Sequence, residues 1–279
     1  MTEDPATPGS GRSGHGGPGE AHGGAPPLTP YAGLGLTALS AVLFFGGGAA
    51  LADSPAVWSL ALLPPLAFLL PALLFARLAG AGRRVFPAAT IGVRGASGAA
   101  AALLGASLLA LALAGVAARW AGPDAGEEGL WRWVMGFGPL GRVCLLAVLP
   151  GLCEEFFFRG ALLACLRSWS PVPACLASGL LFAVFHGSPL RLLPVAVLGV
   201  ALAAVVWLSR NVWVAVAGHV FHNLLVLAAL QHYGAAAEPG AAALALWGLG
   251  GALLLAGGLW MLRGEGGGTR GRDVQREGE

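Results

Sequence analysis

Apolar residues fill most of this chain in long runs, and short polar stretches separate the runs. Most of the runs approach the ~20 residues that an α-helix needs to cross a bilayer, although the fifth is short. We therefore predict an all-α fold, a polytopic membrane helix bundle with about eight transmembrane helices. The expected spans are residues 32–51, 57–78, 96–118, 140–166, 173–186, 190–208, 212–230 and 241–262.

The two ends of the chain lack this pattern. Residues 1–30 are rich in Gly, Pro, Ser and His, and we interpret them as a disordered cytoplasmic tail. The transmembrane domain is expected over residues 31–263, and residues 264–279 form a short polar C-terminal tail. Arginine is more frequent in the segments on the side of the amino terminus, which predicts that both termini are cytoplasmic. We expect a multi-pass protein of the cell inner membrane.

Composition agrees with a membrane protein. Hydrophobic residues make up 56% of the chain and charged residues 11%, whereas soluble domains carry about 25% charged residues. The net charge of +2 gives no basis for a nucleic-acid partner. The four cysteines fall in or beside the expected spans without a CxxC spacing, so they are expected to be small packing residues.

A few polar side chains at membrane depth carry the candidate chemistry. An ionisable residue in the membrane costs roughly 3 kcal/mol or more, so it usually faces the protein interior and has a function. These polar side chains come from three different spans. At about 1.5 Å per helical residue, they reach a similar depth in the membrane, roughly 12 to 20 Å from the same end of their helices. The set is Glu154, Glu155, Arg159, His186, His219, His222 and Asn223.

The spacing of these residues predicts which of them share a helix face. Glu155 and Arg159 are four residues apart and can pair, which leaves Glu154 free. His219 and Asn223 are also four apart and can point at one object. A carboxylate opposite an imidazole can hold a water and take its proton, and an imidazole with an amide can stabilise an oxyanion. The pattern therefore indicates a hydrolase that uses activated water.

Other interpretations of the same residues stay open. Glu154, His186 and His219 are also candidate ligands of a metal such as zinc. A rhomboid-type serine protease needs a GxSG sequence; Gly95–Gly98 has it, but nothing ties it to the buried polar residues. The HExxH sequence of site-2 proteases is absent. The alternative from another class is a non-catalytic membrane protein (a transporter, immunity or scaffold protein) whose buried charges lock helices or relay protons.

The polar pattern resembles the CPBP family of intramembrane proteases, which includes the type II CAAX prenyl endopeptidases and abortive-infection-like proteins. The motifs of that family are EExxxR, FxxxH and HxxxN. Here they read Glu154-Glu155 with Arg159, Phe182 with His186, and His219 with Asn223. All three occur in this order, on separate apolar segments of a motif core at residues 143–230.

The resemblance implies an eight-helix intramembrane endopeptidase, glutamate-dependent or metal-dependent. It implies that Glu154 is the general base that activates water and that His186 helps to position this water. His219 and Asn223 would form the oxyanion site. Whether a cofactor is required, none or zinc, is left open by the resemblance.

The resemblance also implies supporting residues and a class of substrate. Glu155 and Arg159 would support the catalytic groups, and His222, beside the third motif, is interpreted as a packing or supporting residue. The expected partners are the lipid bilayer and a membrane-anchored protein or peptide substrate. Processing of C-terminal anchors of surface proteins is one such activity.

Overall fold

The computed structural model describes residues 28–51, 56–121, 135–233 and 239–276. Most of the expected N-terminal tail, residues 1–27, lies outside the described residues. Every long element that is described is a helix, and the described residues contain no strand. An isolated antiparallel bridge joins Ala88 to Asn211. The predicted all-α class is confirmed.

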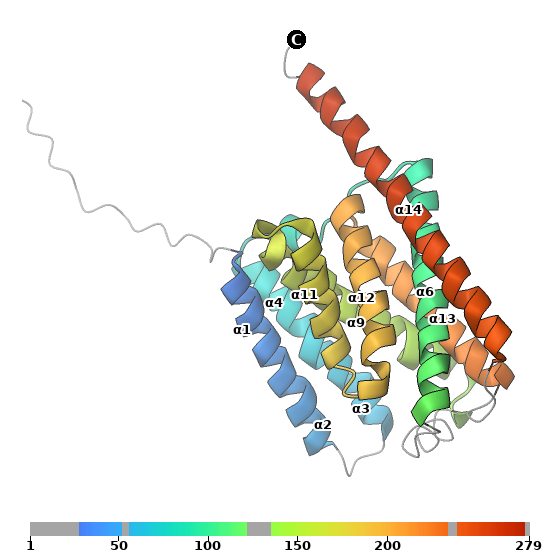
Figure 1. The fold of residues 1–279 in the computed structure, drawn as a ribbon. Helices are drawn as coiled ribbons and strands as arrows, with labels where there is room; N and C mark the ends of the chain where they lie inside the picture. The colour runs from blue at the N-terminus through green and yellow to red at the C-terminus, as the bar shows by residue number, and fades with distance from the viewer. Residues whose placement is uncertain (1–27, 52–55, 122–134, 234–238, 277–279) are drawn as a thin grey trace, which may run out of the picture.

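All eight apolar runs form helices, several of them interrupted by π-helical turns (Figure 1). The elements of the first half are α1 (Pro30–Ala41), η1 (Val42–Gly46), α2 (Gly47–Ala50), α3 (Ala56–Pro64), η2 (Pro65–Leu69), α4 (Leu70–Leu78), α5 (Gly82–Val85) and α6 (Val93–Ala121). Those of the second half are α8 (Pro139–Val143), η3 (Cys144–Val148), α9 (Leu149–Glu155), η4 (Phe156–Leu162), α10 (Leu163–Cys165), η5 (Leu166–Ser168), α11 (Pro171–Val184), α12 (Pro189–Ser209), α13 (Val212–Tyr233) and α14 (Ala241–Arg276).

Six helical segments in the described residues are long and apolar enough to cross a membrane. They are Pro30–Ala50, Val57–Leu78, Val93–Trp120, Pro189–Ser209, Val212–Gln231 and Ala241–Gly264. The α11 helix is apolar but has only 14 residues. The run from α8 to α10 carries four charged residues, namely Arg142, Glu154, Glu155 and Arg159. The polytopic bundle is therefore confirmed, while the count of eight crossings remains a prediction.

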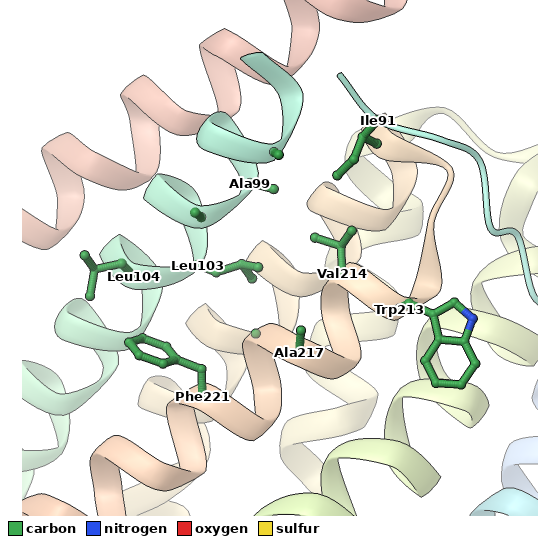
Figure 2. A pocket seen from close by; sticks show the side chains of 11 residues that line it. Ile91, Ala99, Leu103, Leu104, Trp213, Val214, Ala217 and Phe221 are labelled. Carbon is green, nitrogen blue, oxygen red and sulfur yellow. The ribbon is translucent and has the colours of Figure 1, made fainter. Parts of the chain in front are cut away.

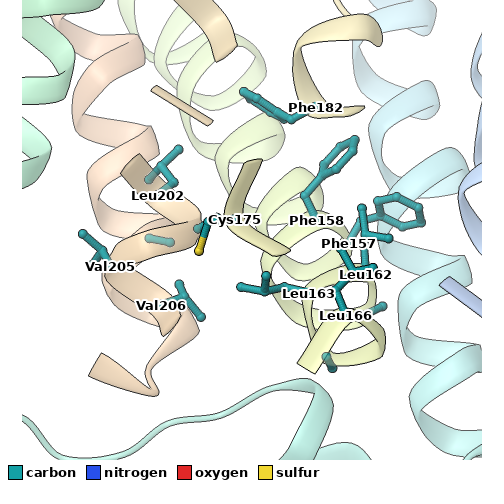
Figure 3. Close-up of a cluster of buried hydrophobic side chains, with 14 of the residues drawn as sticks. Phe157, Phe158, Leu162, Leu163, Leu166, Cys175, Phe182, Leu202, Val205 and Val206 are labelled. Atoms are coloured by element: carbon teal, nitrogen blue, oxygen red, sulfur yellow. The ribbon is translucent and has the colours of Figure 1, made fainter. Parts of the chain in front are cut away.

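The run from α9 to η5 lies at the centre of the bundle. Residues 157–166 are all buried, and Phe157, Phe158 and Leu162 are completely inaccessible to solvent. Figure 3 shows these side chains in one buried cluster with Phe182 from α11 and Leu202 from α12. This buried segment can hold charged side chains because neighbouring helices supply partners for them, as the carbonyl of Gly199 on α12 does for Arg159.

Glycines let the neighbouring helices approach this central segment closely. A Cβ atom added to Gly179 of α11 would lie 2.5 Å from the backbone nitrogen of Val200, so α11 and α12 touch through their backbones. A Cβ atom on Gly151 of α9 would lie 2.8 Å from Cγ2 of Val220 on α13. Ser178 adds a hydrogen bond from its hydroxyl to the carbonyl of Phe158, at 3.1 Å. These contacts fix α11, α12 and α13 around the acidic motif.

A second set of glycines joins α6 to α14, which lie side by side in Figure 1. A Cβ atom on Gly105 would lie 2.6 Å from the carbonyl oxygen of Gly251, and one on Gly258 would lie 2.5 Å from that of Gly98. In a membrane, small residues of this kind allow close helix packing. The α14 helix also continues past the eighth apolar run into polar sequence, as far as Arg276.

Candidate active site

Glu155 and Arg159 form a buried ion pair inside the central helix. Nη1 of Arg159 donates to Oε1 of Glu155 at 2.7 Å, and both side chains are fully buried. Nη2 of Arg159 donates to the backbone carbonyl of Gly199 on α12, at 2.9 Å. The guanidinium also lies 4.4 Å from the ring centre of Phe182. The expected pairing four residues apart is present, and contacts with α11 and α12 hold it in place.

His219 of α13 connects the two adjacent glutamates. Its Nδ1 lies 2.8 Å from Oε1 of Glu155, and its Nε2 lies 4.0 Å from Oε2 of Glu154. The close approach of α9 and α13 at Gly151 brings the ring to this position. The side chain of Glu154 is 15% exposed, whereas that of Glu155 is fully buried. Glu154 is therefore the accessible member of the arrangement, and the buried ring of His219 lies beside it.

His186 reaches the same cluster through Phe182. Its Nδ1 lies 3.1 Å from the carbonyl oxygen of Phe182, and the two rings meet edge to face with centres 4.9 Å apart. Phe182 also meets the ring of His219 edge to face, at 5.5 Å. One phenylalanine thus contacts both imidazoles and the guanidinium of Arg159.

His186 lies just outside the helix in which we predicted it. The α11 helix ends at Val184, and backbone hydrogen bonds from His186 to Ala183 and from Gly187 to Val184 close the turn. Gly187 has φ of 64°, a left-handed conformation that glycine adopts without steric cost and that commonly ends helices. The predicted boundary was wrong by two residues because the glycine stops the helix.

Asn223 and His222 are less closely tied to these residues. Asn223 lies one helical turn beyond His219 and is partly buried, and within the described residues its side chain makes no hydrogen bond to the other candidate groups. His222 is also partly buried. Its Nδ1 is enclosed without a hydrogen-bond partner in the described part of the chain, as are Oε2 of Glu155 and Nε of Arg159. Buried polar atoms without partners are costly, and three of them gather in this region.

The predicted metal ligands do not form a metal site in this arrangement. Two ligands of one tetrahedral zinc ion lie about 3.3 to 3.4 Å apart, because each is about 2.0 to 2.1 Å from the metal. The separation of 4.0 Å between Glu154 and His219 is too wide for that geometry. His186 completes no set of three, since no group of three His, Cys, Asp or Glu in the described residues is placed to hold a metal ion. We derive no chemistry through a metal.

A separate apolar cavity of about 560 Å³ lies between α6 and α13 (Figure 2). From α13 it is lined by Trp213, Val214, Ala217, Gly218 and Phe221. At about 100° per residue, Ala217 and Phe221 point roughly 160° away from His219 on the same helix. The cavity is therefore on the opposite face of α13 from the glutamates, and the candidate chemistry does not reach it.

The GxSG sequence, on which the rhomboid-type alternative depends, also makes no hydrogen bond to the glutamates in the described residues. Ser97, the serine of the GxSG sequence, is exposed near the start of α6. Within the described residues it makes no hydrogen bond to a histidine or to a carboxylate. A serine nucleophile needs a neighbouring base, so this geometry does not favour the rhomboid-type interpretation.

A comparison with known protein families finds a match. The family described as type II CAAX prenyl endopeptidase Rce1-like matches residues 136–225, a segment that contains every residue from Glu154 to Asn223. The resemblance to the CPBP family is confirmed over this segment. No curated protein and no solved structure matches the chain. The match supports the prediction of a membrane protease, and the six candidate spans support a multi-pass membrane protein.

Two partners of the motif residues could not be read from the sequence. The carbonyl of Gly199, which accepts from Arg159, is a backbone group 40 residues away, and no residue type signals such an acceptor. The contact between His219 and Glu155 spans 64 residues. The matched depth of the two helices predicted that His219 would meet the acidic motif, but it did not indicate which glutamate it would contact.

Proposed function

We propose that this protein is an intramembrane endopeptidase in which Glu154 activates the attacking water. The observation that carries the proposal is the pair formed by Oε2 of Glu154, which is partly exposed, and Nε2 of the buried His219, 4.0 Å apart. The match of this segment to a protease family supports the same reaction class.

The hydrogen bond to Glu155 defines which nitrogen of His219 carries a proton. A carboxylate that is paired with Arg159 only accepts hydrogen bonds, so Nδ1 of His219 is the donor in the 2.8 Å contact. In the neutral ring, Nε2 is then an acceptor that faces Glu154. A water about 2.8 Å from both Nε2 and Oε2 would form an angle of about 90° between them, which a single water can satisfy. The two side chains can share one nucleophilic water.

The reaction then follows from the positions of these groups. Glu154 takes one proton from the water as the water oxygen bonds to the carbonyl carbon of the scissile peptide. The same carboxylic acid returns the proton to the leaving nitrogen as the carbon–nitrogen bond breaks, which gives a new carboxyl end and a new amine. The amide of Asn223, one turn from His219, is the candidate donor to the oxyanion. The family resemblance also implies an oxyanion role for His219, but in this scheme its proton is on Nδ1 and its Nε2 accepts from the water.

His186 has a positioning task in this scheme. A carbonyl oxygen only accepts, so the contact with Phe182 puts the proton on Nδ1 and leaves Nε2 of His186 as an acceptor for water or substrate. Glu155 and Arg159 hold His219 without touching substrate. His222 supports the same face of α13.

The substrate class follows from where the site lies. The cluster lies against α12 and α13, two helices that are long and apolar enough to span a membrane, so we propose that a substrate reaches it from the bilayer. We propose a membrane-anchored protein or peptide, cut near its membrane segment, with C-terminal anchors of surface proteins as the first group to examine. Both termini are proposed to be cytoplasmic, and α1 begins at the same end of the bundle at which α14 ends in Figure 1.

The experiment compares the wild type with Glu154→Gln and His219→Ala in the native host membrane, with mass spectrometry of new protein termini. Specific carboxy-terminal cleavages are expected to vanish in both variants while protein levels stay normal. Ser97→Ala is the matched control and should leave every cleavage in place. Unchanged termini in the Glu154 variant would overturn the proposal and favour a non-catalytic protein in which the charges are structural or relay protons.

A further inference from the structure

Two arginines lie near the carboxyl end of α12, and neither pairs with a carboxylate in the described residues. Arg167 lies in η5, directly after the central helix, and its guanidinium carbon is 4.2 Å from the ring centre of Trp207. Trp207 is in the last turn of α12, and Arg210 follows it by three residues, at the cap of the same helix. In the described part of the chain, neither guanidinium has a hydrogen bond or ion pair with a protein acceptor.

The fold holds these charges together against their repulsion. Arg167 is half-buried, and burial together with the neighbouring Arg210 lowers the pKa of Arg167 to about 10. Arg210 adopts φ of 56°, the left-handed region that non-glycine residues rarely occupy. Glycine is the usual residue at this position of a helix end. An arginine here therefore carries a conformational cost in addition to the unfavourable proximity of a like charge.

The location indicates what neutralises the pair. Arg210 and Asn211 form the turn between two candidate membrane spans, Pro189–Ser209 and Val212–Gln231. Tryptophan and arginine side chains at such a boundary lie at the level of the lipid headgroups. A guanidinium presents a planar fork of N–H donors that matches two oxygens of a phosphate group. Basic pockets between transmembrane helices bind anionic lipid headgroups through such contacts.

We infer that Arg167, Trp207 and Arg210 form a binding site for the phosphate of an anionic phospholipid headgroup. The two guanidinium groups bind the phosphate oxygens, Trp207 supports Arg167 from its ring face, and the acyl chains of the lipid lie along the bundle. The inference does not depend on the proposed hydrolysis, because none of the three residues belongs to the candidate catalytic set.

The test titrates the purified full-length protein with phosphatidylglycerol or with phosphatidylcholine of the same acyl chains, and counts bound lipid by native mass spectrometry. The wild type should prefer phosphatidylglycerol. Arg210→Gln should weaken its binding about fivefold, and the double variant Arg167→Gln, Arg210→Gln about thirtyfold. The matched control is Arg83→Gln, Arg84→Gln, which removes two exposed arginines of α5 and should leave binding unchanged.

Arg210→Gly separates binding from folding. Glycine fits φ of 56° without steric cost, so this variant should unfold at the same or a higher temperature than the wild type while it binds phosphatidylglycerol about fivefold more weakly. Equal binding by the wild type and the double variant would overturn the inference, as would an equal loss in the Arg83, Arg84 control. Complete displacement of the lipid by millimolar inorganic phosphate would overturn the lipid assignment in favour of a free anion.

Discussion

Glu155 holds His219 through a 2.8 Å contact between Oε1 and Nδ1, although Glu154 is the glutamate with access to solvent. The two adjacent carboxylates therefore differ in environment: one is enclosed with Arg159, and the other faces the free side of the imidazole. Adjacent groups with different surroundings can take different tasks. We assign orientation of His219 to Glu155 and proton transfer to Glu154.

The first prediction separates the two glutamates by stability. Glu155→Gln removes the carboxylate that neutralises buried Arg159 and should lower the free energy of unfolding by about 3 to 5 kcal/mol, because it leaves an uncompensated buried charge. Glu154→Gln is the same chemical change one residue earlier, without an ion pair to Arg159, and should cost much less. Thermal unfolding in detergent measures both variants. Equal melting temperatures for the two would contradict the division of tasks.

The second prediction concerns the phenylalanine that contacts three of the charged or polar side chains. Phe182→Leu removes the ring that lies 4.4 Å from the Arg159 guanidinium and that packs against both imidazoles. We expect a stability loss of about 1 to 2 kcal/mol from the lost cation–π contact. We also expect a drop of about tenfold or more in kcat, because the imidazoles lose their fixed orientation.

A control for this variant is Phe221→Leu on α13. Phe221 is 42% exposed and lines the cavity on the other face of the helix, so the substitution should leave kcat unchanged. The kinetic measurement uses a cleaved membrane substrate identified from the lost termini. A variant of Phe182 with normal kcat and a raised KM would mean that the ring binds substrate instead of positioning the imidazoles.

The spacing of apolar and charged residues along the chain predicted much of the architecture. The apolar runs predicted where helices form because an apolar segment in a membrane must satisfy its own backbone hydrogen bonds, and a helix does so within the segment. The expected second span, residues 57–78, has the bounds of the candidate span Val57–Leu78. The pair of Glu155 and Arg159 followed from helical periodicity alone.

The features that sequence could not predict depend on contacts between distant segments. The choice of Glu155 over Glu154 by His219 depends on the rotation of α13 against α9, which is set where Gly151 meets Val220. The end of α11 depends on the left-handed conformation of Gly187, and a His-Gly sequence alone does not specify that conformation. Apolar periodicity predicts that a helix is buried, but not which neighbour faces each side chain.

The third prediction tests the glycine contact between α6 and α14. A Cβ atom on Gly258 would lie 2.4 Å from the backbone nitrogen of Ala102, so Gly258→Ala forces the helices apart. We expect a loss of about 1 to 3 kcal/mol, as for other substitutions that overfill a packed interface. Gly257→Ala, the neighbouring position with no atom within 4 Å of an added Cβ, should be neutral or slightly stabilising. Thermal unfolding compares the two, and a loss at both positions would mean that α14 does not pack in this register.

The fourth prediction concerns the turn that carries His186. Gly187 has φ of 64° and open space around an added Cβ, so the cost of Gly187→Ala is conformational, about 1 to 2 kcal/mol. Relief of that strain would move the adjacent His186, so hydrolysis should fall with stability. Gly187→Asn is the matched variant, because asparagine tolerates the left-handed conformation better than alanine does.

The two variants at Gly187 distinguish backbone conformation from side-chain size. Asparagine is larger than alanine, so a steric effect would harm Gly187→Asn more, whereas a conformational effect would harm Gly187→Ala more. We expect Gly187→Asn to unfold at a higher temperature than Gly187→Ala and to cleave substrate faster. The opposite order would show that space beside the turn, not its left-handed backbone, determines where His186 lies.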